Sequence, residues 1–142
     1  MLFTKQQMKF FDKATEVASQ SDFTKYHLGC IAVLKNKVIA ASANKLKTHP
    51  VQKFYDDRYR QFNCLSDPKN MYSLHAEIAC LNQLHGQDIN YRDVELYIVR
   101  MCRVRTYGLA RPCAACMNMI IALGIKKIFY STNVGFAVEQ VG

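Results

Sequence analysis

The stretch PCAACMNMIIALGIKKIFYS, residues 112–131, decides the fold class of this chain. It opens with a proline and a Cys-x-x-Cys pair, runs through apolar residues to Gly124, and then becomes strand-like. Proline suits the start of a helix, and glycine suits its end. The stretch therefore predicts a helix over 113–123, followed by a strand over 125–131.

The first part of the chain adds a helix and a hairpin. Thr4 and Gln7 form a capping-box pattern ahead of apolar residues at three- and four-residue spacing, which predicts an amphipathic helix covering one face of a sheet. Two apolar runs, 28–34 and 38–43, flank the turn-like Lys35-Asn36-Lys37. These runs predict an antiparallel hairpin.

A further helix and strand lie between these two regions. Residues 75–85 carry apolar side chains at helical spacing before Gly86, and 94–104 has the β-branched and aromatic content of a strand. A helix between the strands 94–104 and 125–131 implies parallel pairing with a right-handed crossover. The order of elements predicts an α/β fold, a three-layer α/β/α sandwich with a mixed sheet.

Length and composition limit the class of protein. The 142 residues suit one domain over residues 1–142, and no apolar run approaches the length of about 18 residues that a membrane span needs. The first 20 residues interleave charged and apolar side chains, unlike a signal peptide. We expect a cytoplasmic protein without membrane contact, in which Cys30, Cys80 and Cys102 are reduced, buried thiols.

Positive charge gathers in two parts of the chain, whose formal net charge is +8. Residues 35–60 hold seven Lys or Arg and two Asp, a local net charge of +5. A second cluster consists of Arg100, Arg103, Arg105 and Arg111. Such regions attract anions, from a mononucleotide phosphate to a polynucleotide backbone. The charge favours an anionic substrate, although a solvated basic surface without a partner fits it equally well.

Two fragments, His75-Ala76-Glu77 and Pro112-Cys113-Ala114-Ala115-Cys116, carry the candidate chemistry. His75, Cys113 and Cys116 supply three zinc ligands, the number that a catalytic zinc uses while keeping a fourth position for water or substrate. The two cysteines share one face of a first helical turn, where the helix dipole favours thiolates. His75 and Glu77 would diverge by about 200° inside a helix, so the metal must lie beyond the helix start, with Glu77 beside the open position. A Cys-x-x-Cys pair alone is also typical of thioredoxin-like redox proteins.

A His-x-Glu followed downstream by Pro-Cys-x-x-Cys is the signature of zinc nucleobase deaminases, and the chain resembles the cytidine and deoxycytidylate deaminase superfamily. The resemblance extends over about residues 5–131, because LGCIAVLKNKVIAASAN, LYIV and GIKKIFYS are similar to strands of that superfamily. It implies a cytidine-deaminase-like fold, a Zn²⁺ cofactor and a homo-oligomer. It also implies that zinc hydroxide attacks the ring carbon bearing the amino group while Glu77 shuttles protons. Residues 132–142 are too short for the two further elements of larger relatives.

Three positions are candidate substrate contacts. Asn44 stands where relatives often have a sugar-binding Asn, although a turn residue bonded to its own backbone fits an isolated Asn as well. Ala76 stands where backbone groups of relatives hold the base edge. His49 lies within 44–72, a segment without clean periodicity that we expect to recognise substrate. His49 is also a candidate, with Cys64, for a second metal site.

Two further features of the chain concern the substrate. Relatives that act on deoxycytidylate often have an Asn two residues after the catalytic Glu, and Ala79 at this position counts against that subgroup. The aromatic residues that suit either base stacking or the core are Tyr55, Tyr59, Phe62 and Tyr72.

The leading interpretation is a zinc-dependent hydrolytic deaminase of a cytosine nucleotide, deoxycytidylate or cytidylate. The interleaved basic and aromatic residues of 44–72 support an alternative, a deaminase acting on a base in tRNA or single-stranded DNA. A third interpretation is a non-catalytic, zinc-stabilised binding module, and Glu77 and the lack of a fourth ligand argue against it. The sequence does not determine the base, the sugar or the number of phosphates.

Overall fold

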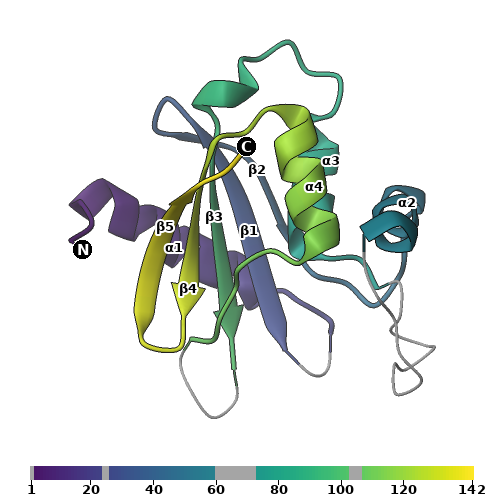
Figure 1. Cartoon of the computed structure of the whole chain (residues 1–142). Coiled ribbons are helices and arrows are strands. Elements are labelled where there is room, and N and C mark those ends of the chain that lie inside the picture. The colour runs from purple at the N-terminus through teal and green to yellow at the C-terminus, as the bar shows by residue number, and fades with distance from the viewer. Residues whose placement is uncertain (1, 24–25, 60–72, 103–106) are drawn as a thin grey trace.

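The computed structural model describes residues 2–23, 26–59, 73–102 and 107–142. In this part of the chain, the strands form one sheet in the order β2-β1-β3-β4-β5 (Figure 1). They are β1 (His27–Leu34), β2 (Lys37–Ala43), β3 (Glu95–Met101), β4 (Lys127–Thr132) and β5 (Gly135–Gln140). Only β3 and β4 pair in parallel, and the other neighbours are antiparallel, so the predicted mixed sheet is confirmed.

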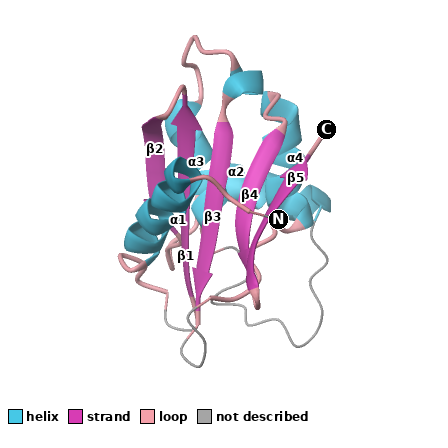
Figure 2. Cartoon of the chain, turned by 90° about the vertical axis from the view of Figure 1, so that its left-hand side faces the viewer, coloured by secondary structure: helices cyan, strands magenta, loops and turns pink. Residues whose placement is uncertain are grey.

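Helices cover both faces of the sheet. The helix α1 (Lys5–Ala18) lies on one face, and α2 (Pro50–Tyr59), α3 (Ala76–Leu84) and α4 (Ala114–Leu123) lie on the other (Figures 1 and 2). A short 3₁₀ helix, η1 (Tyr91–Asp93), precedes β3. This arrangement confirms the predicted three-layer α/β/α sandwich. Among the described helices, none is long and apolar enough to cross a membrane.

Alternating residues of the strands build one core on each face. Towards α1, the ring of Tyr97 stacks on Phe129 with centroids 4.3 Å apart, and Phe11 meets Tyr97 edge-on at 5.1 Å. Gly29 allows this close packing, because a Cβ at that position would lie 2.3 Å from the carbonyl oxygen of Ala14. Towards α3 and α4, the core contains fully buried Leu96 and other aliphatic side chains. Packed apolar side chains therefore cover both faces of the sheet, as the apolar strand sequences require.

The predicted elements form close to their predicted positions. Thr4 and Gln7 make both bonds of the capping box, at 2.8 and 3.0 Å. Lys35 and Asn36 have positive φ angles, as a tight type I′ hairpin turn needs. The two predicted metal-ligand helices each begin one residue later than expected, because His75 and Cys113 have extended backbone and act as N-caps.

Besides the short η1, two elements were not predicted. The helix α2 forms inside 44–72, where its buried side chains are the polar Gln52 and Asp56, so the segment has no apolar period that would reveal a helix. The strand β5 forms inside 132–142 and pairs with β4 through a hairpin. Its residues are mostly half-buried, as expected at the edge of a sheet.

Candidate metal centre and active site

The starts of α3 and α4 bring the three predicted zinc ligands together. His75 Nδ1 lies 3.3 Å from Cys116 Sγ and 3.6 Å from Cys113 Sγ. All three ligand atoms lie within 4.8 Å of one another, and no other His, Cys, Asp or Glu of the described residues joins this group. Residues 38 and 41 positions apart in sequence thus meet at one point.

The separations suit a tetrahedral zinc ion. With Zn–S bonds of about 2.3 Å and a Zn–N bond of about 2.0–2.1 Å, tetrahedral angles place nitrogen and sulfur about 3.6 Å apart. The two observed N···S distances lie at and slightly below this value. The ligand set of one imidazole and two thiols therefore fits zinc and leaves a fourth position for water or substrate.

The two cysteines differ in their affinity for a proton. A hydrogen bond from Cys116 lowers the pKa of Cys113 to about 3, with His75 acting in the same direction. Burial raises the pKa of Cys116, and the thiolate of Cys113 adds to that rise. Cys113 therefore loses its proton more readily than Cys116, and zinc would favour the thiolate form of both.

Glu77 stands in the first turn of α3 and is only 4% exposed. Its Oε1 has no hydrogen-bond partner among the described residues, which is a costly arrangement for a buried carboxyl oxygen. Burial raises the pKa of Glu77, while the charge of His75 opposes that rise. A carboxyl group of this kind, beside a metal-ligand cluster, can accept and return a proton near neutral pH.

A cavity of about 220 Å³ opens beside this cluster. His75, Glu77 and Cys113 line one part of it. The remaining lining residues are Tyr26, Leu28, Arg100, Leu109, Ala110 and Arg111. The cavity therefore joins two of the three candidate metal ligands and the carboxyl group to two arginines, Arg100 and Arg111.

The predicted substrate contacts lie at different distances from this cavity. Ala76 is buried between His75 and Glu77, at the first position of α3. Asn44 is 2% exposed and supports the cavity wall from behind, since its Oδ1 accepts a bond from the Leu28 N–H at 2.9 Å. Its Nδ2 donates to the Tyr26 carbonyl at 3.3 Å. Neither Ala76 nor Asn44 is among the lining residues.

His49 caps the start of α2 instead of lining this cavity. Its Nδ1 accepts a bond from the Val51 N–H at 3.1 Å, and its Nε2 lies 3.3 Å from Asn82 Nδ2. Tyr55 lines a separate cavity of about 460 Å³ between α2, α3 and α4, which contains none of the zinc ligands. Tyr59, the last residue of α2, is 43% exposed and lines neither cavity. Phe62, Cys64, Tyr72, Arg103 and Arg105 lie outside the described residues.

The structure adds a support for the metal site that sequence reasoning missed. The His75 N–H donates to Gln52 Oε1 at 2.9 Å, and Gln52 Nε2 donates to Asp56 Oδ1 at 2.7 Å. Gln52 and Asp56 are fully buried on α2. Because the His75 N–H can only donate, it takes Gln52 Oε1 as its acceptor and leaves Gln52 Nε2 to donate to Asp56. In the sequence, the i, i+4 spacing of Gln52 and Asp56 was the only indication that these two side chains interact.

The chain was also compared with known proteins. A family profile described as "Cytidine and deoxycytidylate deaminase zinc-binding region" matches residues 4–132. The fold is similar to that of dCMP deaminase from the cyanophage S-TIM5, with 20% identity, 92% of this chain and 86% of that chain covered, and a TM-score of 0.58. That enzyme in complex with dCMP and dUMP matches with 19% identity, coverage of 93% and 85%, and a TM-score of 0.57. Cytidine deaminase from Burkholderia pseudomallei matches with 14% identity, coverage of 97% and 93%, and a TM-score of 0.62. No curated protein matches the sequence.

Proposed function

This chain belongs to the cytidine and deoxycytidylate deaminase family, and from that premise we propose that it hydrolyses the amino group of a cytosine nucleotide of the dCMP or CMP type. One observation carries the proposal. The buried carboxyl group of Glu77 lines the same small cavity as His75 and Cys113. In the overall reaction, water replaces the amino group of cytosine, so that uracil and ammonia are formed.

The residues divide the chemistry between them. His75, Cys113 and Cys116 would hold zinc, which supplies an activated water as nucleophile when bound. Glu77 takes a proton from the attacking water and passes it to the ring nitrogen beside the amino-bearing carbon. Glu77 then takes the second proton from the added oxygen and delivers it to the departing amino group, which leaves as ammonia. Burial suits this role, because the raised pKa of Glu77 brings it closer to neutral pH.

The cavity wall supports a nucleotide as the substrate. Arg100 and Arg111 line it, so cationic groups face the same space as Glu77. A solved neighbour of this fold is described in complex with dCMP and dUMP. The substrate contacts expected of Asn44, Ala76 and His49 stay predictions. Ala76 lies next to Glu77, at the first position of α3. Asn44 would act on the cavity wall through its hydrogen bonds to Tyr26 and Leu28.

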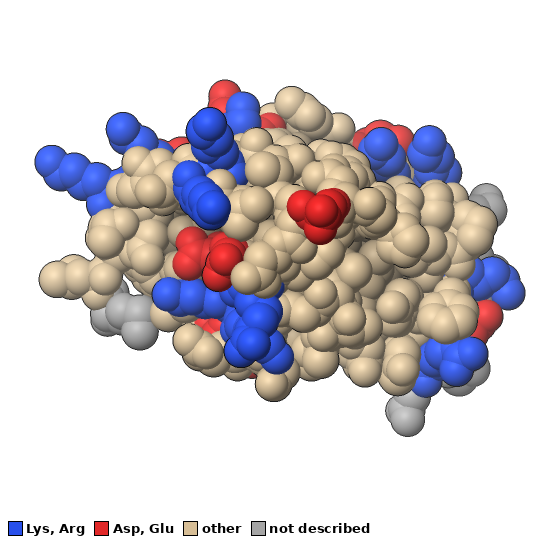
Figure 3. Space-filling view, turned by 90° about the horizontal axis from the view of Figure 1, so that it is seen from above, with Lys and Arg blue, Asp and Glu red and all other residues tan. Residues whose placement is uncertain are grey.

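The alternative substrate, a base in tRNA or single-stranded DNA, needs a continuous basic surface. Figure 3 shows the end of the molecule at the top of Figure 1, where Lys and Arg side chains lie mainly near the edges and alternate with acidic ones. The cavity lies at the opposite end of the molecule, where β3 and β4 end and α3 and α4 begin (Figure 1), so the substrate screen below decides between a nucleotide and a polynucleotide. The homo-oligomer and the cytoplasmic location stay predictions.

A substrate screen tests the proposal. Ammonia release would be measured for the zinc-loaded protein with cytosine, cytidine, deoxycytidine, CMP, dCMP, single-stranded DNA and tRNA. We expect release from a cytosine nucleotide, and a loss of at least about a hundredfold in Glu77→Gln with zinc still bound. Glu16→Gln, at an exposed position of α1, is the matched control. A zinc-loaded protein that deaminates only polynucleotides, or nothing at all, would contradict the proposal.

A further inference from the structure

We propose that Arg100 is the residue that selects a phosphorylated substrate over the neutral nucleoside, by binding the 5′-phosphate of the nucleotide. This inference rests on the proposed function, because it assigns a role at the same cavity. It begins with a difference between two arginines that line this cavity, Arg100 and Arg111.

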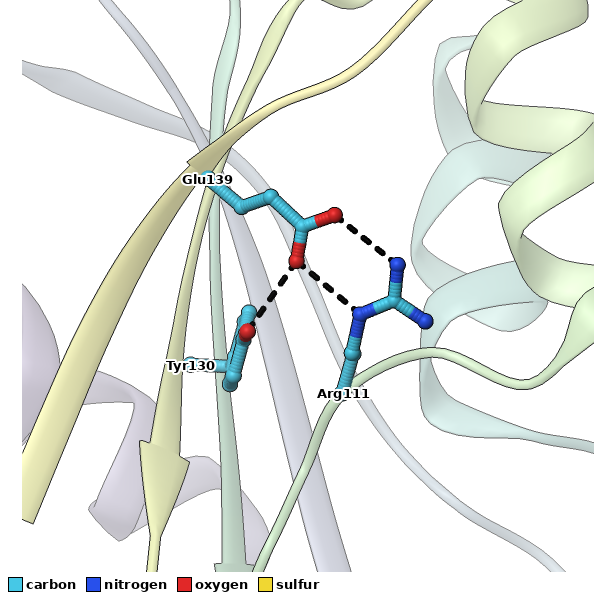
Figure 4. Close-up of polar contacts among 3 residues, drawn as sticks. All are labelled: Arg111, Tyr130 and Glu139. Carbon is cyan, nitrogen blue, oxygen red and sulfur yellow. Dashed lines mark hydrogen bonds and ion pairs between the residues drawn. The ribbon is translucent and has the colours of Figure 1, made fainter.

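Arg111 is already neutralised. Its Nε and one terminal nitrogen donate to the two carboxylate oxygens of Glu139 at 2.9 and 2.8 Å, and the Tyr130 hydroxyl donates to the same carboxylate at 3.0 Å (Figure 4). This is a bidentate pair, in which both oxygens of the acid are used. Arg111 therefore offers little charge to a ligand.

Arg100 has no such partner. Within residues 2–23, 26–59, 73–102 and 107–142, no acidic group pairs with its guanidinium, and its buried Nε makes no hydrogen bond. Its guanidinium carbon lies 4.5 Å from the ring centroid of Tyr26, so one face of the planar group rests on an aromatic ring. Stacking holds the group in place without consuming its N–H donors, which remain for an anion.

The backbone around Arg100 is held from two sides. On β3, the Arg100 N–H donates to Ser131 Oγ at 3.0 Å, and its carbonyl accepts from the Gly108 N–H at 2.8 Å. Ser131 Oγ donates to the Gly108 carbonyl at 2.7 Å, which closes this small network. Tyr26 is anchored in turn by Asn44. The stacked pair of Arg100 and Tyr26 is therefore a preorganised group on the cavity wall.

The ligand chemistry follows from the two kinds of group that line the cavity. An amino-bearing base must reach Glu77, and a planar, uncompensated guanidinium favours a bidentate phosphate. Both groups line one cavity of about 220 Å³. A mononucleotide with a 5′-phosphate meets both requirements.

Binding measurements on the Glu77→Gln background test this assignment, because bound substrate is not consumed there. Zinc-loaded protein would be titrated with dCMP and deoxycytidine, and with CMP and cytidine, by calorimetry. The two ligands of each pair differ only by the phosphate. The dissociation constant of the nucleoside divided by that of the nucleotide therefore measures how strongly the protein recognises the phosphate. We expect the nucleotide to bind about tenfold to a hundredfold more tightly, as hydrogen bonds to a charged group do.

Arg100→Gln should reduce this ratio to near one, and Arg100→Lys should keep part of it. Arg58→Gln is the matched control, since Arg58 also lies over an aromatic ring, 4.4 Å from the centroid of Phe54, but outside this cavity. An unchanged ratio in Arg100→Gln, or no preference for the nucleotide while Arg100 is present, would overturn the inference. Tighter binding of a short single-stranded oligonucleotide than of dCMP would overturn the assignment to a mononucleotide.

Two further readouts separate the possible failures. Zinc content and thermal midpoint show whether Arg100→Gln is folded. If Arg100→Gln is not folded, the protein with Arg100 intact provides the test. Its preference for the nucleotide over the nucleoside should fall as KCl is raised, and a preference insensitive to salt would contradict the inference. A wild-type protein that prefers nucleotides through Arg100 but releases no ammonia from them would refute the proposed function and leave the inference standing.

Discussion

Two groups of residues at the cavity, named here the metal end and the arginine end, arise in different ways. The metal end consists of His75, Glu77, Cys113 and Cys116, which two short motifs place at the starts of two helices. The arginine end consists of Tyr26, Arg100 and Arg111, which come from three separate segments. Local sequence is enough to identify chemistry at the metal end. At the arginine end, the neighbours of each cation decide whether its charge is available.

The largest expected effect is at the metal end. Cys116→Ser removes a fully buried zinc ligand, so zinc affinity and ammonia release should each fall by at least about a hundredfold. Metal analysis after dialysis and the ammonia assay would measure this. Cys80 is also buried but lies on α3, so Cys80→Ala should lower the free energy of unfolding and leave the zinc content unchanged. Equal zinc content in wild type and Cys116→Ser would break the assignment of the metal end.

A second variant tests whether the metal end depends on tertiary support as well. Gln52→Leu leaves the His75 N–H and the Asp56 carboxylate without their shared partner. We expect a loss of about 3 kcal/mol in the free energy of unfolding and a zinc affinity about tenfold to a hundredfold lower. Urea unfolding and competition with a chelator would measure the two quantities. Lys53→Gln, an exposed neighbour on α2, should change neither, and a Gln52→Leu protein with normal zinc affinity would confine the metal end to its two motifs.

A smaller effect is expected where the arginine end is held by close packing. A Cβ added at Gly108 would lie 2.6 Å from Cys102 Sγ and 3.3 Å from Arg100 Cδ. Gly108→Ala should therefore displace Arg100 and weaken dCMP binding about threefold to tenfold, with zinc content unchanged. Cys102→Ala in the same protein should restore part of the binding, since it removes the nearest atom. Undiminished dCMP binding in Gly108→Ala would show that Arg100 is not held in this way.

The smallest effect concerns the neutralised arginine. Glu139→Gln removes the carboxylate that pairs with Arg111, at a cost of at most about 1 kcal/mol because the pair is partly exposed. Arg111 lowers the pKa of Glu139 in the folded protein. This contribution is therefore fully present above the ordinary carboxyl pKa of 4.5 and is lost as the pH falls through the lowered value. Unfolding of wild type and variant at neutral and acidic pH should show a difference that disappears in acid; a difference that persists would point to another cause.

Sequence reasoning performed best where one element carries its own signal. The capping box at Thr4 and the apolar runs of the hairpin were confirmed because hydrogen bonding within a few residues decides them. The helix α2 was missed because its buried face is polar, and Gln52 and Asp56 have a reason to be buried only when His75 lies against them. The strand β5 was missed because pairing with β4 stabilises it more than its own composition does.

By itself, the sequence predicted the α/β class, three candidate metal ligands and a carboxyl group beside them, because the spacing of Cys113 and Cys116 puts both on one helical turn and their motif occurs together with His-x-Glu in zinc deaminases. Only the tertiary structure decided that Asn44 supports a wall and that Gln52 anchors His75. It also decided that, among the described residues, Arg111 pairs with a carboxylate while Arg100 does not. Such differences depend on contacts between segments far apart in the chain. Charge interactions, hydrogen bonds and burial depend on distances in space, and the order of residues along the chain does not give those distances.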